Sequence, residues 1–177
     1  MEDRAYAHRL PLAAAGVPAQ QEPVGARTVV TPEELCEIEE IKNLRYLYAH
    51  YYDGNRTDEL VDLFTEDAVC DFGESYGKWV GKEEIQREYA SAAASGRTDY
   101  GILHNVMNPW IRLVDETTAR GRWYLINTRS TVGEENPLML CGIYDETYKK
   151  TGDGWKIHRT RIDFLWPRRE YVGSTDL

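Results

Sequence analysis

An aspartate and a histidine carry the clearest chemical signal in this chain. Asp53 lies where an amphipathic helix should end, and His104 lies inside an apolar, strand-like run at 102–106. A carboxylate at a helix C-terminus faces the negative end of the helix dipole, which disfavours it by about a few tenths of a kcal/mol. If the fold brings Asp53 onto one ring nitrogen of His104, the carboxylate fixes the tautomer, and the imidazole becomes a general base near neutral pH.

Both residues also have a structural explanation. Asp-Gly, at 53–54, is a common turn dipeptide. A single histidine in a strand is more often a hydrogen-bonded core residue than a catalyst. The residues alone leave both alternatives open.

Length and charge narrow the class of protein. A chain of 177 residues fits one domain that can enclose a pocket, and its net charge of -9 argues against a nucleic-acid partner, which would need a basic face. No run approaches the ~20 apolar residues of a membrane span, and acidic residues at positions 2 and 3 argue against a signal peptide. We therefore expect a cytoplasmic protein whose ligand is a small molecule.

Cysteines and histidines show no metal-binding pattern. Cys36, Cys70 and Cys141 are widely spaced within apolar segments, which predicts reduced, buried thiols. Neither Cys-x-x-Cys nor His-x-x-x-His occurs, and the 4 histidines are far apart in the chain. We predict no metal and no cofactor.

Helices are predicted in the first half of the chain. Thr31, Pro32 and Glu34 indicate a capped helix that runs to about Asp53, with an apolar face that begins at Leu35. Charged residues are assigned to its solvent face: Glu37, Glu39, Glu40, Lys42 and Arg45. Further elements are expected as a helix at 57–64, a strand at 68–72, a short strand at 77–81 and a third helix from 82 to a stop at 96.

The period changes to two in the second half of the chain. Four consecutive strands are predicted at 102–114, 118–131, 138–149 and 155–166. Helices followed by a meander indicate an α+β fold, a curved antiparallel sheet packed on three N-terminal helices with a pocket between them. The predicted parts of the chain are a flexible arm at 1–30, the domain at 31–168 and a tail at 169–177.

Six short segments recur in an order that resembles a known superfamily. They are Ile38-Glu39-Glu40-Ile41-Lys42-Asn43-Leu44, Tyr52-Asp53-Gly54, Leu63-Phe64-Thr65-Glu66-Asp67-Ala68-Val69, Leu103-His104-Asn105, Ala119-Arg120-Gly121-Arg122-Trp123-Tyr124-Leu125 and Gly154-Trp155-Lys156-Ile157. Over roughly residues 33–166 the chain resembles the SnoaL-like branch of the nuclear transport factor 2-like superfamily. It is most similar there to bile acid 7α-dehydratases and related cofactor-free lyases, which include scytalone dehydratase and hexachlorocyclohexane dehydrochlorinase. The resemblance implies a cone-shaped α+β barrel.

The resemblance also implies roles for individual residues. In these lyases an aspartate at the end of the first helix and a histidine on the strand after the third helix transfer the proton, which assigns catalysis to Asp53 and His104. A tyrosine that precedes the aspartate maps onto Tyr48, whose phenol would donate a hydrogen bond to a leaving or carbonyl oxygen. A core tyrosine on the inward helix face is the alternative for Tyr48.

Three positions depart from the bile acid dehydratase pattern. Asn127 stands in place of an aspartate, Phe72 in place of a tyrosine and Phe164 in place of an arginine. An amide orients a hydroxyl or carbonyl but takes no proton at neutral pH. The loss of polar contacts puts a bile acid substrate in doubt and favours a flatter, aromatic or polycyclic ligand.

Aromatic residues are expected to line the pocket. The chain has 12 tyrosines and 5 tryptophans, and packing between strands is the alternative role for each of them. The predicted substrate-binding residues are Asn127, Phe72, Tyr76, Trp123, Tyr144 and Phe164.

The predicted function is a cofactor-independent lyase that performs a dehydratase-type elimination on a hydrophobic cyclic or aromatic hydroxylated molecule. A deformylating lyase acting on a phenolic diol, and an isomerase or cyclase, stay open because each needs one base and one hydrogen-bond donor in a dry cavity. A non-catalytic binding or assembly module, including a dioxygenase small subunit, is the alternative of another class. An exposed apolar sheet face predicts a homo-oligomer, with a trimer, as in the similar lyases, ahead of a dimer.

Overall fold

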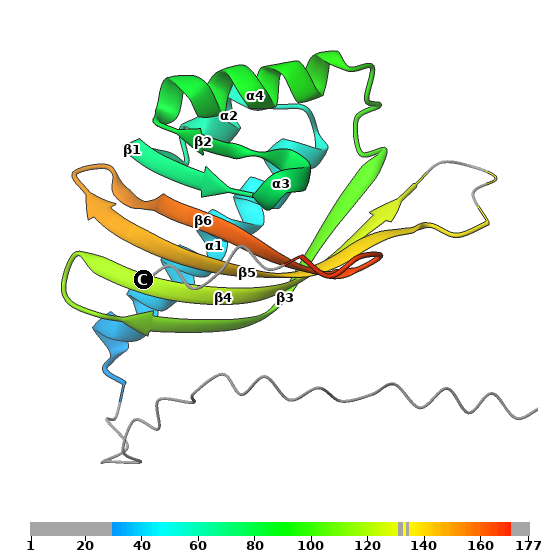
Figure 1. Cartoon of the computed structure of the whole chain (residues 1–177). Helices are drawn as coiled ribbons and strands as arrows, with labels where there is room; N and C mark the ends of the chain where they lie inside the picture. The colour runs from blue at the N-terminus through cyan, green and yellow to red at the C-terminus, as the bar shows by residue number, and fades with distance from the viewer. Residues whose placement is uncertain (1–29, 131–132, 134, 171–177) are drawn as a thin grey trace, which may run out of the picture.

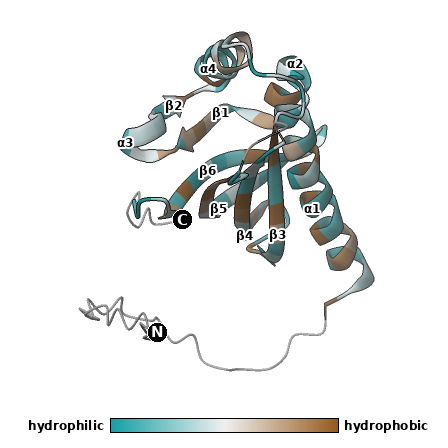
Figure 2. Ribbon diagram, turned by 90° about the vertical axis from the view of Figure 1, so that its right-hand side faces the viewer, coloured by the Kyte–Doolittle hydropathy of each residue, from teal (hydrophilic) through white to brown (hydrophobic). Residues whose placement is uncertain are grey.

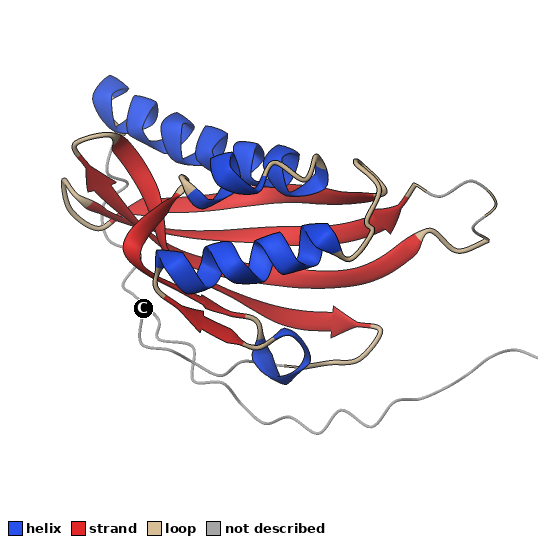
Figure 3. Ribbon diagram, turned by 90° about the horizontal axis from the view of Figure 1, so that it is seen from above, coloured by secondary structure: helices blue, strands red, loops and turns tan. Residues whose placement is uncertain are grey.

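The computed structural model describes residues 30–130, 133 and 135–170 as helices packed on one side of a curved sheet (Figures 1 and 3). Its elements in chain order are α1 (Pro32–Asp53), α2 (Thr57–Val61), β1 (Phe64–Asp71), α3 (Gly73–Tyr76), β2 (Lys78–Val80), α4 (Lys82–Ala94), β3 (Ile102–Leu113), β4 (Thr118–Arg129), β5 (Leu138–Thr151) and β6 (Gly154–Trp166). The predicted α+β class is confirmed, and the four long strands follow the predicted boundaries closely.

The sheet has six strands in the order β2-β1-β6-β5-β4-β3. Neighbouring strands run antiparallel except β1 and β6, which pair in parallel, so the sheet is mixed where we expected an antiparallel one. The chain returns from β1 to β6 only after crossing the whole meander, and such a long connection permits a parallel pair. Strands β2 and β3 form the two edges, and the sheet does not close on itself.

Strand periodicity directs one face of the sheet toward the helices. Along β4, Trp123, Leu125 and Asn127 are buried, whereas Tyr124 between them is half exposed. Figure 2 shows the same alternation as brown and teal segments along the strands. The core therefore lies between the concave face of the sheet and the helices α1 and α4.

Helix α1 begins at the predicted cap. The Thr31 hydroxyl accepts a hydrogen bond from the Glu34 backbone N–H at 3.1 Å, and the Glu34 carboxylate accepts one from the Thr31 N–H at 2.8 Å. This reciprocal pair is the capping box, with Pro32 in the first helical turn. At the other end the Gly54 N–H donates to the His50 carbonyl at 3.0 Å, which ends the helix directly after Asp53.

We expect the Thr31→Ala substitution to lower the free energy of unfolding by about 1 kcal/mol, because it removes the side-chain acceptor for one N-terminal N–H. Urea denaturation followed by circular dichroism measures the change. Ser91→Ala, at an exposed position within α4, is the matched control and should leave the stability unchanged or slightly higher. An equal loss in both variants would show that the capping box contributes nothing specific.

Three assignments on α1 are wrong. Leu35, placed on the inward face, is 52% exposed, and Cys36 is exposed as well, because the first turns of the helix extend beyond the strands (Figure 2). Arg45, placed on the solvent face, is fully buried. Its guanidinium lies between two aromatic rings, 4.0 Å from the centroid of Tyr48 and 3.8 Å from that of Tyr144.

A short helix, α3, connects β1 with β2, in a segment for which the sequence predicted no helix. Gly73, its first residue, and Gly77, which directly follows it, have φ values of 69° and 90°, a region that favours glycine. The Glu170 carboxylate accepts hydrogen bonds from the Glu74 N–H at 2.6 Å and from the Ser75 hydroxyl at 2.8 Å. Residue 170, which we assigned to the tail, is thus attached to the domain.

The predicted N-terminal arm, apart from Val30, and residues 171–177 of the tail lie outside the described residues. Within the part of the chain that is described, no helix is both long and apolar enough to cross a membrane.

Candidate active site

Asp53 and His104 meet at the end of α1. One carboxylate oxygen of Asp53 lies 2.5 Å from the Nδ1 atom of His104, and the other accepts the backbone N–H of His104 at 2.8 Å. The two side chains are 8% and 7% exposed. Because the carboxylate holds both the ring and the backbone of the same residue, the position and the rotation of the imidazole are fixed together.

Arg97 secures the helix end that carries Asp53. Its Nη2 atom donates to the Tyr52 carbonyl at 2.8 Å, and its Nε and Nη2 atoms donate to the Asn55 side-chain oxygen at 2.9 and 2.6 Å. The guanidinium also lies 4.0 Å from the centroid of the Tyr52 ring. A cation at this point offsets the negative end of the helix dipole, which explains why a carboxylate is tolerated there. Sequence reasoning missed Arg97, because no spacing rule connects the loop after α4 with the end of α1.

The second ring nitrogen of His104 faces Asn127. The two residues are directly opposite each other on β3 and β4, and the Asn127 Nδ2 atom lies 3.1 Å from Nε2. With Nδ1–H donating to Asp53, Nε2 accepts from the amide and is the basic atom of a neutral imidazole. We assign this tautomer from the hydrogen-bond partners. The amide oxygen of Asn127 is buried without a hydrogen-bond partner among the described residues.

An inner cavity of about 160 Å³ adjoins His104 and Asn127. Besides these two, it is lined by five of the predicted site residues, namely Tyr48, Phe72, Tyr76, Tyr144 and Phe164. Other aromatic and apolar side chains complete the lining: Tyr52, Trp79, Tyr89, Ile102, Leu125, Met139, Leu140 and Ile162. The inner cavity thus brings together predicted site residues from several elements, and it adds Tyr89 of α4, which was not among them.

Trp123, which we predicted as a substrate-binding residue, does not line this cavity. It is fully buried, and its indole N–H donates to the Tyr148 hydroxyl at 2.9 Å. Its side chain points inward, like those of Leu125 and Asn127, yet it lies nearer the start of β4, where it is packed in the core. The alternation of side chains along a strand determines which face of the sheet a residue lies on, but it does not determine how near to the cavity that residue lies.

A family model described as the SnoaL-like domain matches residues 33–161. The chain belongs to the SnoaL-like family. An uncharacterized protein of Mycobacterium tuberculosis is 29% identical to this SnoaL-like protein over 134 residues, which cover 75% of this chain and 88% of that protein.

Solved structures of similar proteins have the same fold. A proposed scytalone dehydratase from Novosphingobium aromaticivorans has a TM-score of 0.64 and 24% identity, covering 74% of this chain and 85% of the other. An NTF2-like protein with a cystatin-like fold from the same organism has a TM-score of 0.64 and 19% identity, covering 77% and 86%. The SnoaL-like protein therefore has the NTF2-like cone fold.

Burial determines the protonation of the site in this SnoaL-like protein. It lowers the pKa of His104 below its ordinary value, and the hydrogen bond to Asp53 only partly offsets this effect. Burial raises the pKa of Tyr48 well above its ordinary value. At neutral pH the site therefore holds an unprotonated imidazole beside phenols that keep their protons. This combination suits removal of a proton from one ligand atom and donation of a hydrogen bond to another.

We expect the free energy of unfolding to fall as the pH drops below about 6.5, the ordinary pKa of histidine. As the pH falls, the unfolded chain binds a proton at His104 before the folded protein does. The contribution of the neutral imidazole to the free energy of unfolding is therefore fully present above pH 6.5, and it decreases as the pH falls toward the lower pKa of the folded state. Partial burial also lowers the pKa of His158, so the measurement uses the His158→Gln protein. Adding His104→Gln should flatten the pH dependence of urea denaturation. An unchanged slope would contradict the lowered pKa of His104.

The described residues contain no cluster of side chains typical of a metal site. Within residues 30–130, 133 and 135–170, no group of three or more histidine, cysteine, aspartate or glutamate side chains is placed to hold a metal ion.

Proposed function

We propose that this SnoaL-like protein is a cofactor-independent lyase that eliminates water from a hydrophobic, cyclic or aromatic hydroxylated molecule. His104 Nε2 takes a proton from carbon, and the electrons of that bond form the double bond as hydroxide departs. The same proton then passes to the leaving hydroxyl, so that water is released and the imidazole is regenerated. Asp53 orients the ring and stabilises the imidazolium during the reaction.

The observation that carries the proposal is the contact between Asp53 and His104 Nδ1 at 2.5 Å, which leaves Nε2 as the basic atom next to a mostly aromatic cavity. Burial of both side chains excludes water from the base. The Tyr48 and Tyr89 hydroxyls are 2.8 Å apart, and this pair supplies a donor for an oxygen of the substrate. A structural neighbour, the proposed scytalone dehydratase from Novosphingobium aromaticivorans, is also described as a dehydratase.

Mass spectrometry of products tests the proposal. Cyclic β-hydroxyketones and phenolic benzylic alcohols are incubated with the protein, and a product lighter by one water is expected. His104→Gln should lower its rate of formation by about a hundredfold or more. His50→Gln, which changes an exposed histidine on α1, should retain the wild-type rate. Equal rates in the two variants, or the absence of any dehydrated product from the whole panel, would contradict the function.

The outer face of the sheet supports a proposed homo-oligomer, with a trimer expected ahead of a dimer. Leu103 on β3 and Tyr124 on β4 are exposed apolar residues on that face. Covering such residues with another copy removes apolar surface from water. Light scattering should therefore report a mass above 20.4 kDa, and a monomer at every concentration would contradict this expectation.

A further inference from the structure

The inner cavity limits the size of the group that reaches His104. Its volume of about 160 Å³ is close to the roughly 150 Å³ of an engineered apolar cavity that binds benzene. The cavity therefore accommodates a single six-membered ring. Of the aromatic or polycyclic ligands that the sequence favoured, the space beside His104 thus suits a single ring.

A second, larger cavity continues from the first. It has a volume of about 710 Å³ and shares Tyr76, Met139, Leu140 and Phe164 with the inner cavity. The outer cavity lies closer to solvent, since its wall includes Trp166, which is 38% exposed, and Tyr76 is 56% exposed at the junction. A ligand whose ring contacts His104 can thus extend past these four side chains into the outer cavity.

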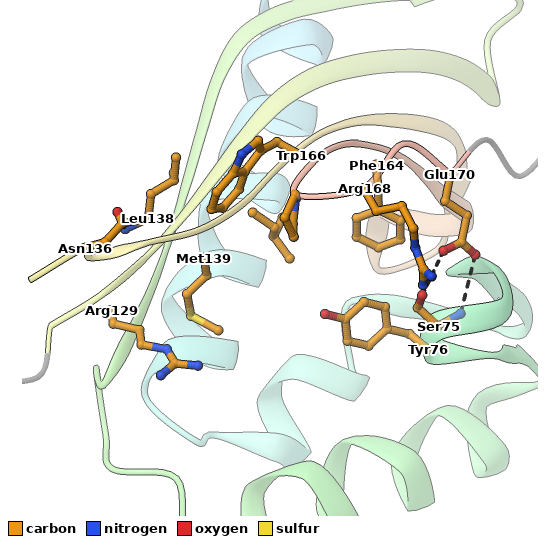
Figure 4. A pocket seen from close by; sticks show the side chains of 12 residues that line it. Ser75, Tyr76, Arg129, Asn136, Leu138, Met139, Phe164, Trp166, Arg168 and Glu170 are labelled. Carbon is orange, nitrogen blue, oxygen red and sulfur yellow. Dashed lines mark hydrogen bonds between the residues drawn. The ribbon is translucent and has the colours of Figure 1, made fainter. Parts of the chain in front are cut away.

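The outer cavity differs from the inner one in its charge. Arg129 at the end of β4 and Arg168 after β6 contribute guanidinium groups to its lining (Figure 4), whereas the inner cavity is lined by no arginine or lysine. One acidic residue, Glu170, accompanies them. Its carboxylate already accepts hydrogen bonds from the Ser75 hydroxyl and the Glu74 N–H, which bind it to α3 and, with the nearby charge of Arg168, lower the pKa of Glu170.

Arginine is suited to carboxylates, because its planar group donates two parallel hydrogen bonds to them. Two arginines at one opening are notable in a chain whose net charge is -9. The ring end of a ligand, by contrast, meets the unpartnered amide oxygen of Asn127, which requires a donor such as a hydroxyl.

We propose that the ligand is a hydroxylated single-ring compound with a side chain that ends in a carboxylate. The ring occupies the inner cavity with its hydroxyl toward Asn127 and His104, and the carboxylate lies between Arg129 and Arg168 in the outer cavity. This inference rests on the proposed function for the position of the ring. It adds the substrate class and two specificity-determining residues.

Calorimetric titration tests the charge preference. The probes are a series of para-hydroxyphenyl alkanoates of increasing chain length and the neutral primary alcohols of matching length. For at least one length, we expect the alkanoate to bind wild type about fivefold more tightly than its alcohol, which is a typical effect for partly exposed ion pairs, and added salt should reduce the difference. In Arg129→Gln/Arg168→Gln the preference should disappear. Arg122→Gln, an exposed position of opposite parity on the same strand, should keep it.

Three outcomes would overturn the proposal. The alkanoate and the alcohol bind wild type equally at every length, or no probe binds, or Arg122→Gln removes the preference as completely as the double variant does. Repeating the titration with His104→Gln separates this inference from the proposed function. A charge preference without any dehydration by wild type would refute only the lyase, whereas dehydration of neutral substrates without a charge preference would refute only the carboxylate site.

Discussion

Asp53→Asn should lower kcat of the proposed elimination by about a thousandfold with little change in KM. Replacing the carboxylate of an aspartate–histidine pair by an amide costs about 10⁴ in kcat in the serine protease example, because the ring is held in the wrong tautomer. Here the amide nitrogen of the new side chain would donate to His104 Nδ1, and the proton would move to Nε2, the atom that must act as base.

The control for this prediction is Asp99→Asn. Asp99 accepts a hydrogen bond from the Asn55 side chain at 2.6 Å, near the end of α1, but it is exposed and forms no hydrogen bond with His104 in the described part of the chain. We expect its kcat to remain near the wild-type value. Steady-state kinetics on both variants, with circular dichroism to verify folding, measures the effect. A folded Asp53→Asn protein within tenfold of wild type would show that the carboxylate is structural only.

Glu146→Gln should lower the free energy of unfolding by about 3 to 5 kcal/mol, the typical cost of leaving one member of a buried ion pair without its partner. Arg45 and Glu146 are both fully buried, with 3.4 Å between Nη1 and Oε1. Glu146 also accepts hydrogen bonds from the Thr160 hydroxyl at 2.7 Å and from the Tyr148 hydroxyl. None of the guanidinium nitrogens of Arg45 has a hydrogen-bond partner among the described residues, so its charge depends on the ion pair and the two rings.

A double variant separates the ion pair from simple packing. Arg45→Met/Glu146→Gln removes both charges, and it should be more stable than Glu146→Gln alone, because replacing a whole buried pair by uncharged groups is often neutral. Urea denaturation at a pH above 7 measures these two proteins and Arg45→Met alone. If the double variant loses as much as the sum of the two single variants, the pair is not coupled, and the charge of Arg45 is not the cause of the loss.

Patterns among neighbouring residues predicted the helix that carries Asp53. The capping box fixed the start of α1, and the helical period placed Asp53 at its end, so both bounds of the helix follow from nearby residues. Asn127 and Tyr144, which we predicted as substrate-binding residues, lie on the concave face beside the inner cavity. The resemblance to the lyases then linked Asp53 with His104, which no local rule connects.

Tertiary contacts explain what the sequence could not predict. Arg45 lies on the same helix face as the buried Ile41 and Tyr48, and it was assigned to solvent because of its charge. The rings of Tyr48 and Tyr144, with Glu146, make its burial possible. A single sequence carries no sign of such a buried charge, because arginine is expected at the surface by default. Arg97 is a similar case, since its role depends on a loop returning to the end of α1.

Cavity size also lay beyond the sequence. Composition predicted an aromatic pocket, and the aromatic lining is present, but its volume depends on how far each ring reaches into the space. Trp123 shows the same limit, because the residue has the predicted direction and a different depth.

A double-mutant cycle on kcat tests the central claim, that Asp53 and His104 act as one unit in proton transfer. Rates are measured for wild type, Asp53→Asn, His104→Gln and the protein with both changes. Residues that act together are strongly non-additive, so the doubly substituted protein should be about as slow as His104→Gln alone. Losses that multiply would show that the two residues act independently and would contradict the dyad.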